Sequence, residues 1–297
     1  MILNTANLAS LFTGYKANFQ SAFMQATPDW PTVATEVPSS TETNLYAWLG
    51  QFPRLREWLG DRIVKNISTS NYSVTNKQFE ATVGVPIPKI KDDTYGVFAP
   101  LMSEMGYAAK LHPDEILFAM LLAGHTGLCY DGQGFFDTDH PVVVSGAVTT
   151  SSNYDATGGG NMWCLMDTKR PIKPLIYQNR EPYNFQTFTQ PGSEHVFKRN
   201  EYLYGVDARM AGAYGLWQLA YASLNTLNAT NFDAAVTAMM SFKSDEDRPL
   251  GIRPNLLVVG PSNRAAARSL IETQFTSTGA SNPNYKEVDV LVSPYFV

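Results

Sequence analysis

The first 44 residues constrain the fold of this chain most strongly. Apolar side chains recur at helical spacing and predict an amphipathic helix, at Leu8, Leu11, Phe12, Tyr15, Phe19 and Phe23. Residues 27–44 follow, rich in Pro, Thr and Ser and poor in apolar side chains. A helix tethered by such a linker needs a surface on which to bury its apolar face. It therefore packs either on its own domain or on a neighbouring copy of the chain.

Composition favours a protein that associates with other subunits. Charged residues make up 16% of the 297 residues, against about 25% in average soluble domains, while hydrophobic residues make up 44%. A lone globule of this size needs a charged surface, so the deficit indicates that surface is buried against other chains.

Several classes of function are disfavoured by the same totals. The net charge is −5 and no stretch is rich in Lys or Arg, so tight binding to a nucleic-acid backbone is not expected, although a protein that encloses DNA is compatible. No apolar run approaches the roughly 20 residues that span a bilayer, and the N-terminus lacks a secretory signal. Cys129 and Cys164 match no metal or redox spacing, which favours a reduced, cytoplasmic setting.

Hydrophobic periodicity predicts an α+β chain with long elements. Helices are expected over residues 95–110, 116–123, 215–227, 232–242 and 263–275, with a short helical stripe at Leu45, Trp48, Leu49 and Phe52. Strands are expected over residues 62–67, 72–75, 163–166, 172–178, 201–209, 256–259 and 288–292. Residues 145–161 consist largely of Ser, Thr, Gly and Asn and predict a surface loop.

One cluster resembles a chemical site. Asp137, Asp139 and His140 could ligate a metal or supply acid–base groups, which would suit a metal-dependent hydrolase. The alternative is a turn in which the Asp side chains accept hydrogen bonds from nearby backbone N–H groups. The turn is favoured, because no second cluster of His or carboxylates supplies further ligands. The sequence therefore predicts no catalytic, cofactor-binding or metal-binding residue, and no enzyme.

Several blocks, in order along the chain, resemble the Mu-like bacteriophage major head subunit family. The most similar block is residues 128–133 with 135–141, which includes Phe-Phe-Asp-Thr-Asp-His-Pro. The other blocks are residues 79–86, 92–100, 173–180, 204–209 and 215–221.

The resemblance implies the tailed-phage major capsid (Johnson) fold. It assigns residues 1–44 to an N-terminal arm and residues 45–90 to the region of an extended β-hairpin loop. Residues 91–228 would form mainly a peripheral domain with a spine helix, and residues 229–297 mainly an axial domain. The hairpin itself would run from Ile63 to Val83.

The resemblance also implies a function and a set of partners. Copies would assemble into pentamers and hexamers of an icosahedral head that encloses double-stranded DNA without sequence-specific binding. A separate scaffolding protein, a portal and a decoration protein would be partners, no membrane would be involved, and the virion capsid would be assembled in the host bacterial cytoplasm. An encapsulin-type cellular nanocompartment is the alternative use of the same fold.

Nine residues are candidates for contacts between subunits. The arm contributes one group, and the polar hairpin, which is marginal in isolation, contributes the other. They are Leu8, Leu11, Phe12, Tyr15, Phe19, Ile67, Tyr72, Val74 and Phe79.

Overall fold

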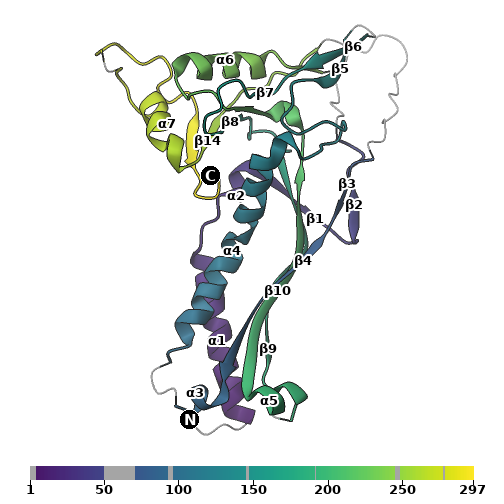
Figure 1. The fold of residues 1–297 in the computed structure, drawn as a ribbon, viewed down its shortest axis with the longest axis vertical. Coiled ribbons are helices and arrows are strands. Elements are labelled where there is room, and N and C mark those ends of the chain that lie inside the picture. Colours follow the sequence, from purple (N-terminus) through teal and green to yellow (C-terminus); the bar gives the residue numbers. More distant parts are fainter. Residues whose placement is uncertain are drawn as a thin grey trace.

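The computed structural model describes residues 5–49, 71–92, 96–144, 147–190, 192–244, 248–276 and 278–297. The molecule has an elongated lower part and a broader upper part (Figure 1). Two long helices lie beside a long sheet in the lower part, and a second sheet lies between shorter helices in the upper part. None of the helices among the described residues is long and apolar enough to span a membrane.

The long sheet has the strand order β1-β9-β10-β4. Its strands are β1 (Ala34–Pro38), β9 (Leu175–Phe188), β10 (Glu201–Tyr214) and β4 (Lys77–Pro86). β9 and β10 form an antiparallel hairpin with helix α5 (Glu194–Arg199) between them, and β4 pairs antiparallel with β10 along its whole length. The strands expected over 172–178 and 201–209 are therefore confirmed, although β9 begins only at Leu175, and both continue beyond their expected ends.

Helix α1 (Thr5–Gln25) packs on its own chain, which is the first of the two alternatives for the N-terminal helix. Leu8, Tyr15 and Phe19 are buried in a core that α1 shares with α4 and with the long sheet. The rings of Tyr15 and Tyr204 meet edge to face with centroids 5.1 Å apart, and Phe19 lies 5.0 Å from Phe185. These contacts satisfy the apolar face within one chain.

Helix α4 (Ala99–Leu122) is one continuous element, where the sequence predicts two helices, over 95–110 and 116–123. Pro113 lies inside α4 and is buried. A proline removes one N–H and usually ends or kinks a helix, but packing on both sides of it offsets that cost here. Met105, Leu117 and Phe118 are buried on either side of Pro113.

The upper sheet has the strand order β15-β14-β8-β11-β7. Its strands are β15 (Asp289–Val292), β14 (Leu256–Val259), β8 (Trp163–Met166), β11 (Ala220–Ser223) and β7 (Tyr154–Asp155). Helices α6 (Ala229–Met240) and α7 (Arg264–Ile271) flank it in Figure 1. The strands expected over 163–166, 256–259 and 288–292 and the helix expected over 232–242 are confirmed, and α7 ends before the expected residue 275.

Two expectations for the upper part are wrong. Residues 215–227 do not form a helix. They contain a 3-10 turn (η2, Trp217–Leu219) followed by β11. Because β11 pairs with β8 on one side and β7 on the other, these partner strands determine its conformation. Residues 145–161 are not all surface loop, since they contain β6 (Ala147–Ser151) and β7, and Asn153 between them is completely buried.

The helical stripe expected at Leu45, Trp48, Leu49 and Phe52 is also wrong in the described residues. Leu45 ends a strand, β2 (Thr43–Leu45), which pairs antiparallel with β3 (Ser73–Thr75). Tyr46 and Leu49 are buried in the turn that follows. The expected strand at 72–75 is confirmed as β3, and the one at 62–67 lies outside the described residues.

The remaining elements are short. They are α2 (Trp30–Val33), α3 (Ile87–Asp92), β5 (His140–Val144), β12 (Lys243–Ser244), β13 (Arg248–Pro249) and the 3-10 turns η1 (Ala123–His125) and η3 (Pro261–Asn263).

Candidate assembly surfaces

The cluster at Asp137, Asp139 and His140 does not converge on a site. Asp137 accepts hydrogen bonds from the backbone N–H groups of Gly134 (3.2 Å) and Thr138 (2.6 Å), as the turn interpretation predicts. Asp139 is exposed, whereas the His140 side chain is completely buried. The three side chains therefore do not form the site of a metal-dependent hydrolase.

His140 belongs instead to a buried polar network. Its Nδ1 lies 2.8 Å from Asp131 Oδ2 and its Nε2 lies 3.1 Å from Asn153 Oδ1. The Asn153 Nδ2 donates to the backbone carbonyl oxygens of Phe135, Trp217 and Ala220, which fixes the amide orientation. Both ring nitrogens are therefore within hydrogen-bond distance of an oxygen. The ring also stacks on Trp217, with centroids 4.0 Å apart.

Cys129 completes this network. The ligand atoms of Cys129, Asp131 and His140 lie within 4.8 Å of one another, a grouping that could hold a metal ion. Each atom is already bonded, because the thiol donates to Asp131 Oδ1 at 2.9 Å and the carboxylate also accepts from His140. Burial raises the pKa of the Cys129 thiol. Burial alone would raise the pKa of Asp131 too, but hydrogen bonds from His140 and Cys129 outweigh it and hold that pKa below its usual value. We assign the network a structural role.

The candidates for contacts between subunits fall into three groups. Leu8, Tyr15 and Phe19 are buried, and Leu11 and Phe12 are half-buried against the same core. Val74 is buried in the upper core, where the Tyr72 hydroxyl accepts a hydrogen bond from the N–H of Tyr214. Phe79 lines a groove. Ile67 lies outside the described residues.

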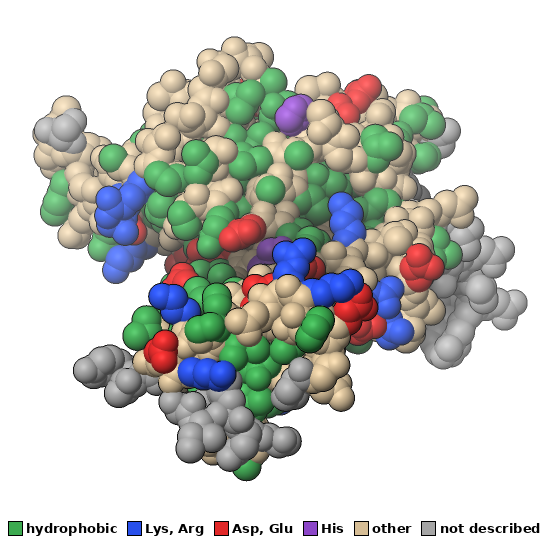
Figure 2. Space-filling view, turned by 60° about the horizontal axis from the view of Figure 1, so that its bottom comes forward, with side chains coloured by type: hydrophobic (Ala, Val, Ile, Leu, Met, Phe, Trp, Pro, Cys, Tyr) green, Lys and Arg blue, Asp and Glu red, His purple; other side chains and the backbone are tan. Residues whose placement is uncertain are grey.

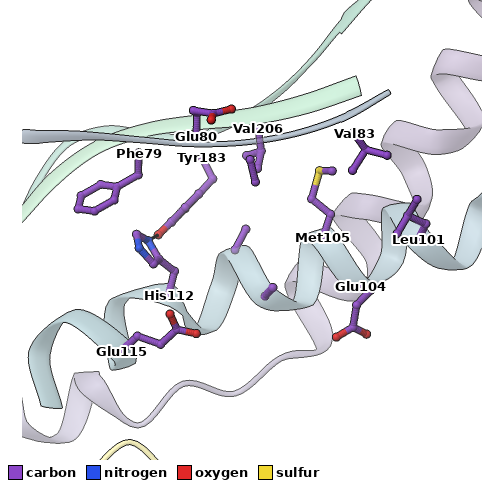
Figure 3. Close-up of a pocket in the computed structure, with 13 residues that line it drawn as sticks. Phe79, Glu80, Val83, Leu101, Glu104, Met105, His112, Glu115, Tyr183 and Val206 are labelled. Atoms are coloured by element: carbon purple, nitrogen blue, oxygen red, sulfur yellow. Dashed lines mark hydrogen bonds between the residues drawn. The ribbon is translucent and has the colours of Figure 1, made fainter. Parts of the chain in front are cut away.

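This groove lies between α4 and the β4–β10 edge of the long sheet and has a volume of about 400 Å³ (Figure 3). Its walls are mainly apolar and include Phe79, Val83, Leu101, Met105 and Val206. Phe79 is a candidate from the sequence, but the groove is not predicted there. The alternation of Phe79, Ala81 and Val83 on one side of β4 is a signal that could have indicated it.

Apolar side chains also reach the surface outside the groove. In the face shown in Figure 2, most charged side chains gather across the middle and lower half of the view, and the upper part is mainly apolar and uncharged polar. Phe197 in α5 is 88% exposed and Met24 at the end of α1 is 82% exposed. Helix α5 is not among the helices expected from the sequence. Ser193 before Glu194, with Lys198 and Arg199 in the last turn, is a signal that could have indicated it.

Comparison with known sequences finds one matching family. The profile of the family described as Mu-like prophage major head subunit gpT matches residues 8–296. The "Major capsid protein" of Escherichia phage Mu is 36% identical over 304 residues, covering 99% of this chain and 100% of that protein. The "Mu-like prophage FluMu major head subunit" of Haemophilus influenzae is 41% identical over 272 residues, covering 89% of this chain and 88% of that protein.

Solved structures show the same similarity. The chain of the "Procapsid of bacteriophage JBD30" superposes with a TM-score of 0.88 at 47% identity, covering 99% of this chain and 100% of that chain. The chain of the "Bacteriophage JBD30 capsid" superposes with a TM-score of 0.80 at 37% identity, covering 100% of both. The mixed α+β fold is therefore that of phage capsid proteins.

Proposed function

The chain belongs to the Mu-like prophage major head subunit gpT family and is a structural major capsid protein of the virion, not an enzyme; on that premise we propose how its copies build the head. Copies form pentamers and hexamers through contacts between unlike surfaces, which close into rings, and the rings tile an icosahedral shell. The similarity to the JBD30 procapsid chain over 99% of the chain carries this proposal.

The parts of the molecule fit the Johnson fold as follows. Residues 1–44 form the arm, residues 45–90 the region of the extended loop, and α4 the spine helix. The long sheet with α1 and α4 supports a peripheral domain within 91–228, and the upper sheet with α6 and α7 supports an axial domain that includes 229–297. Because β8 and β11 pair within the upper sheet, we assign both to the axial domain as well.

Three further partners are proposed. A separate scaffolding protein directs assembly, a portal occupies one vertex, and a decoration protein binds the outer surface. One JBD30 capsid structure is described as decorated with minor capsid protein trimers. A trimer binds equivalent surfaces on three copies, so it belongs where three copies meet. The shell encloses DNA without sequence-specific contacts, which suits a chain with 27 acidic and 22 basic residues.

The ring arrangement is tested by producing the chain with and without the scaffolding protein of its own head-gene cluster. We expect uniform closed shells with the scaffold, and fivefold and sixfold rings in an electron microscopy reconstruction of them. Uniform shells made equally well without a scaffold would contradict the separate scaffold. A lattice without sixfold rings would contradict the pentamer and hexamer arrangement.

A further inference from the structure

The groove between α4 and β4 has apolar walls that the described part of its own chain leaves open. Leu101 at its edge is 41% exposed, and Phe79 and Val83 are half-buried. An apolar recess of this kind receives an anchoring aromatic or aliphatic side chain of a partner. The groove is therefore a surface on which another protein chain docks.

The charges that border the groove on α4 are acidic. Glu104 and Glu115 are exposed there, at its border rather than between α4 and the sheet (Figure 3). Glu80 on β4 projects from the opposite face of its strand. The described lining residues include no Lys or Arg. A segment that combines a large apolar side chain with a cation therefore matches the groove in both shape and charge.

Helix α5, at the lower end of the molecule in Figure 1, carries such a combination. Phe197 is 88% exposed, so it does not fill the groove of its own copy. Lys198 beside it is also exposed and forms an ion pair with Glu194 one turn earlier. An ion pair between two exposed side chains is weak in water, which leaves the Lys198 ammonium able to meet a second carboxylate.

The ends of α5 hold Phe197 in a fixed position. Val196, the residue before it, is buried in the core that α1 and α4 share with the long sheet. The Ser193 hydroxyl accepts a hydrogen bond from the N–H of Val196, and the N–H of Asn200 donates to the Val196 carbonyl oxygen. Both ends of the helix are therefore capped. A side chain that is already held in place loses little conformational freedom on binding, so Phe197 is a pre-organised anchor.

A second copy of the chain is the partner that a shell supplies at every position. Each copy has one open groove and one exposed Phe197, and the two surfaces are unlike. Contacts between unlike surfaces use every copy in the same way and close into rings. Both surfaces lie in the elongated lower part of the molecule, and α5 forms its lower end (Figure 1). Helix α5 therefore reaches beyond its own copy towards the groove of a neighbour.

We propose that Phe197 of one copy inserts into the groove of a neighbouring copy, between Leu101 and Val83. The Lys198 ammonium then lies against Glu104 at the border of that groove. This inference rests on the proposed shell. It adds which surface receives α5 and which chemistry recognises it.

Disulfide trapping tests the contact between copies. One chain carries Phe197→Cys, a second carries Leu101→Cys, and the two are assembled together with the scaffolding protein and oxidised. Both native cysteines are buried, so the background is low. We expect a covalent dimer on non-reducing gels that contains one chain of each kind. Shells that form without this dimer would overturn the proposal.

Two matched controls accompany the trapping. Phe197→Cys paired with Phe275→Cys, which is exposed in the upper part, should give no dimer. Shells of Phe197→Cys chains alone should also give none. A dimer in the second control would place α5 of one copy against α5 of another and would count against the groove.

Exchanging the charges tests the recognition. Lys198→Glu and Glu104→Lys should each lower the yield of shells at least about threefold, measured by sedimentation, because each places like charges together. One chain with both changes should recover the yield. Glu104→Lys combined with Arg199→Glu is the matched control and should not recover it. A chain with both Lys198→Glu and Glu104→Lys that assembles no better than the single variants would overturn this pairing.

An electron microscopy reconstruction of wild-type shells keeps the proposal falsifiable if the variants do not assemble. We expect the Phe197 ring of one copy in the groove of its neighbour. A reconstruction with Phe197 elsewhere, or with another protein in the groove, would overturn the proposal. A wild-type chain that makes no shells with its scaffold would instead contradict the proposed function.

Discussion

Asp114 joins the segment after α1 to helix α4. Its side chain is buried, and its carboxylate accepts hydrogen bonds from the N–H groups of Asp29 (2.9 Å) and Trp30 (2.7 Å) at the start of α2. Burial raises the pKa of Asp114, while these two hydrogen bonds lower it and the neighbouring acids Asp29 and Glu115 raise it further. One residue of α4 therefore fixes where the chain turns from α1 towards β1.

Replacing Asp114 by Asn should destabilise the subunit. The amide keeps one acceptor oxygen and turns an NH₂ group towards a backbone N–H, which leaves a buried donor unsatisfied. We expect a loss of about 1–3 kcal/mol in the free energy of unfolding, measured with urea on the unassembled chain. Asp289→Asn at an exposed site is the control and should change little. An equal effect of both substitutions would show that the two hydrogen bonds contribute nothing.

The buried network predicts a loss of stability in acid. The pKa of Asp131 lies below its usual 3.8 in the folded chain, so the unfolded chain takes up the proton first as the pH falls. The contribution of Asp131 is complete above its usual pKa and is lost as the pH falls through the lowered one. Wild type and Asp131→Asn should therefore differ most above about pH 5, and the difference should shrink as the pH falls below 3.8 in urea unfolding experiments. A difference that stays constant with pH would contradict this assignment.

At the scale of elements, the contact between α1 and α4 depends on a glycine. A Cβ added at Gly106 in α4 would overlap the backbone carbonyl of Phe19 in α1, whereas a Cβ at Gly14 in α1 would have no neighbour within 4 Å. The close approach of the two helices therefore requires Gly106.

Two alanine substitutions should have opposite effects. Gly106→Ala should push α1 away and cost about 1–3 kcal/mol in the free energy of unfolding, as overpacking does. Gly14→Ala should raise it by up to ~1 kcal/mol, because alanine is the better helix former. Hydrogen exchange of the α1 amides reports the site of the change, and it should be faster only in Gly106→Ala. Unchanged exchange in that variant would contradict the tight packing.

Hydrophobic periodicity predicts those helices and strands whose conformation depends on the residues of one segment alone. The stripe of α1 and the apolar runs of β8 and β14 are of this kind. Residues 220–223 are different, because their strand conformation comes from pairing with β8 and β7. The network of Asp131, His140 and Asn153 joins separate positions that only the fold brings together. The groove has the same origin, since its walls come from β4, α4 and β10.

At the scale of the whole molecule, exposed apolar side chains mark surface that the shell should cover. Phe197 lies in α5 between β9 and β10, at the lower end of the molecule in Figure 1, and is almost fully exposed. Phe197→Ser should leave the thermal unfolding of the unassembled chain unchanged and lower the yield of shells. Arg199→Gln on the same helix is the control. An unchanged yield for Phe197→Ser, measured by sedimentation, would show that α5 contributes no apolar contact.

Electron microscopy of the purified chain, produced with its scaffolding protein, tests the central claim most directly, with light scattering on the same sample. A major capsid protein that buries its sparsely charged surface between copies should form closed shells or rings of capsomer size. A monodisperse monomer or dimer under these conditions would contradict the account.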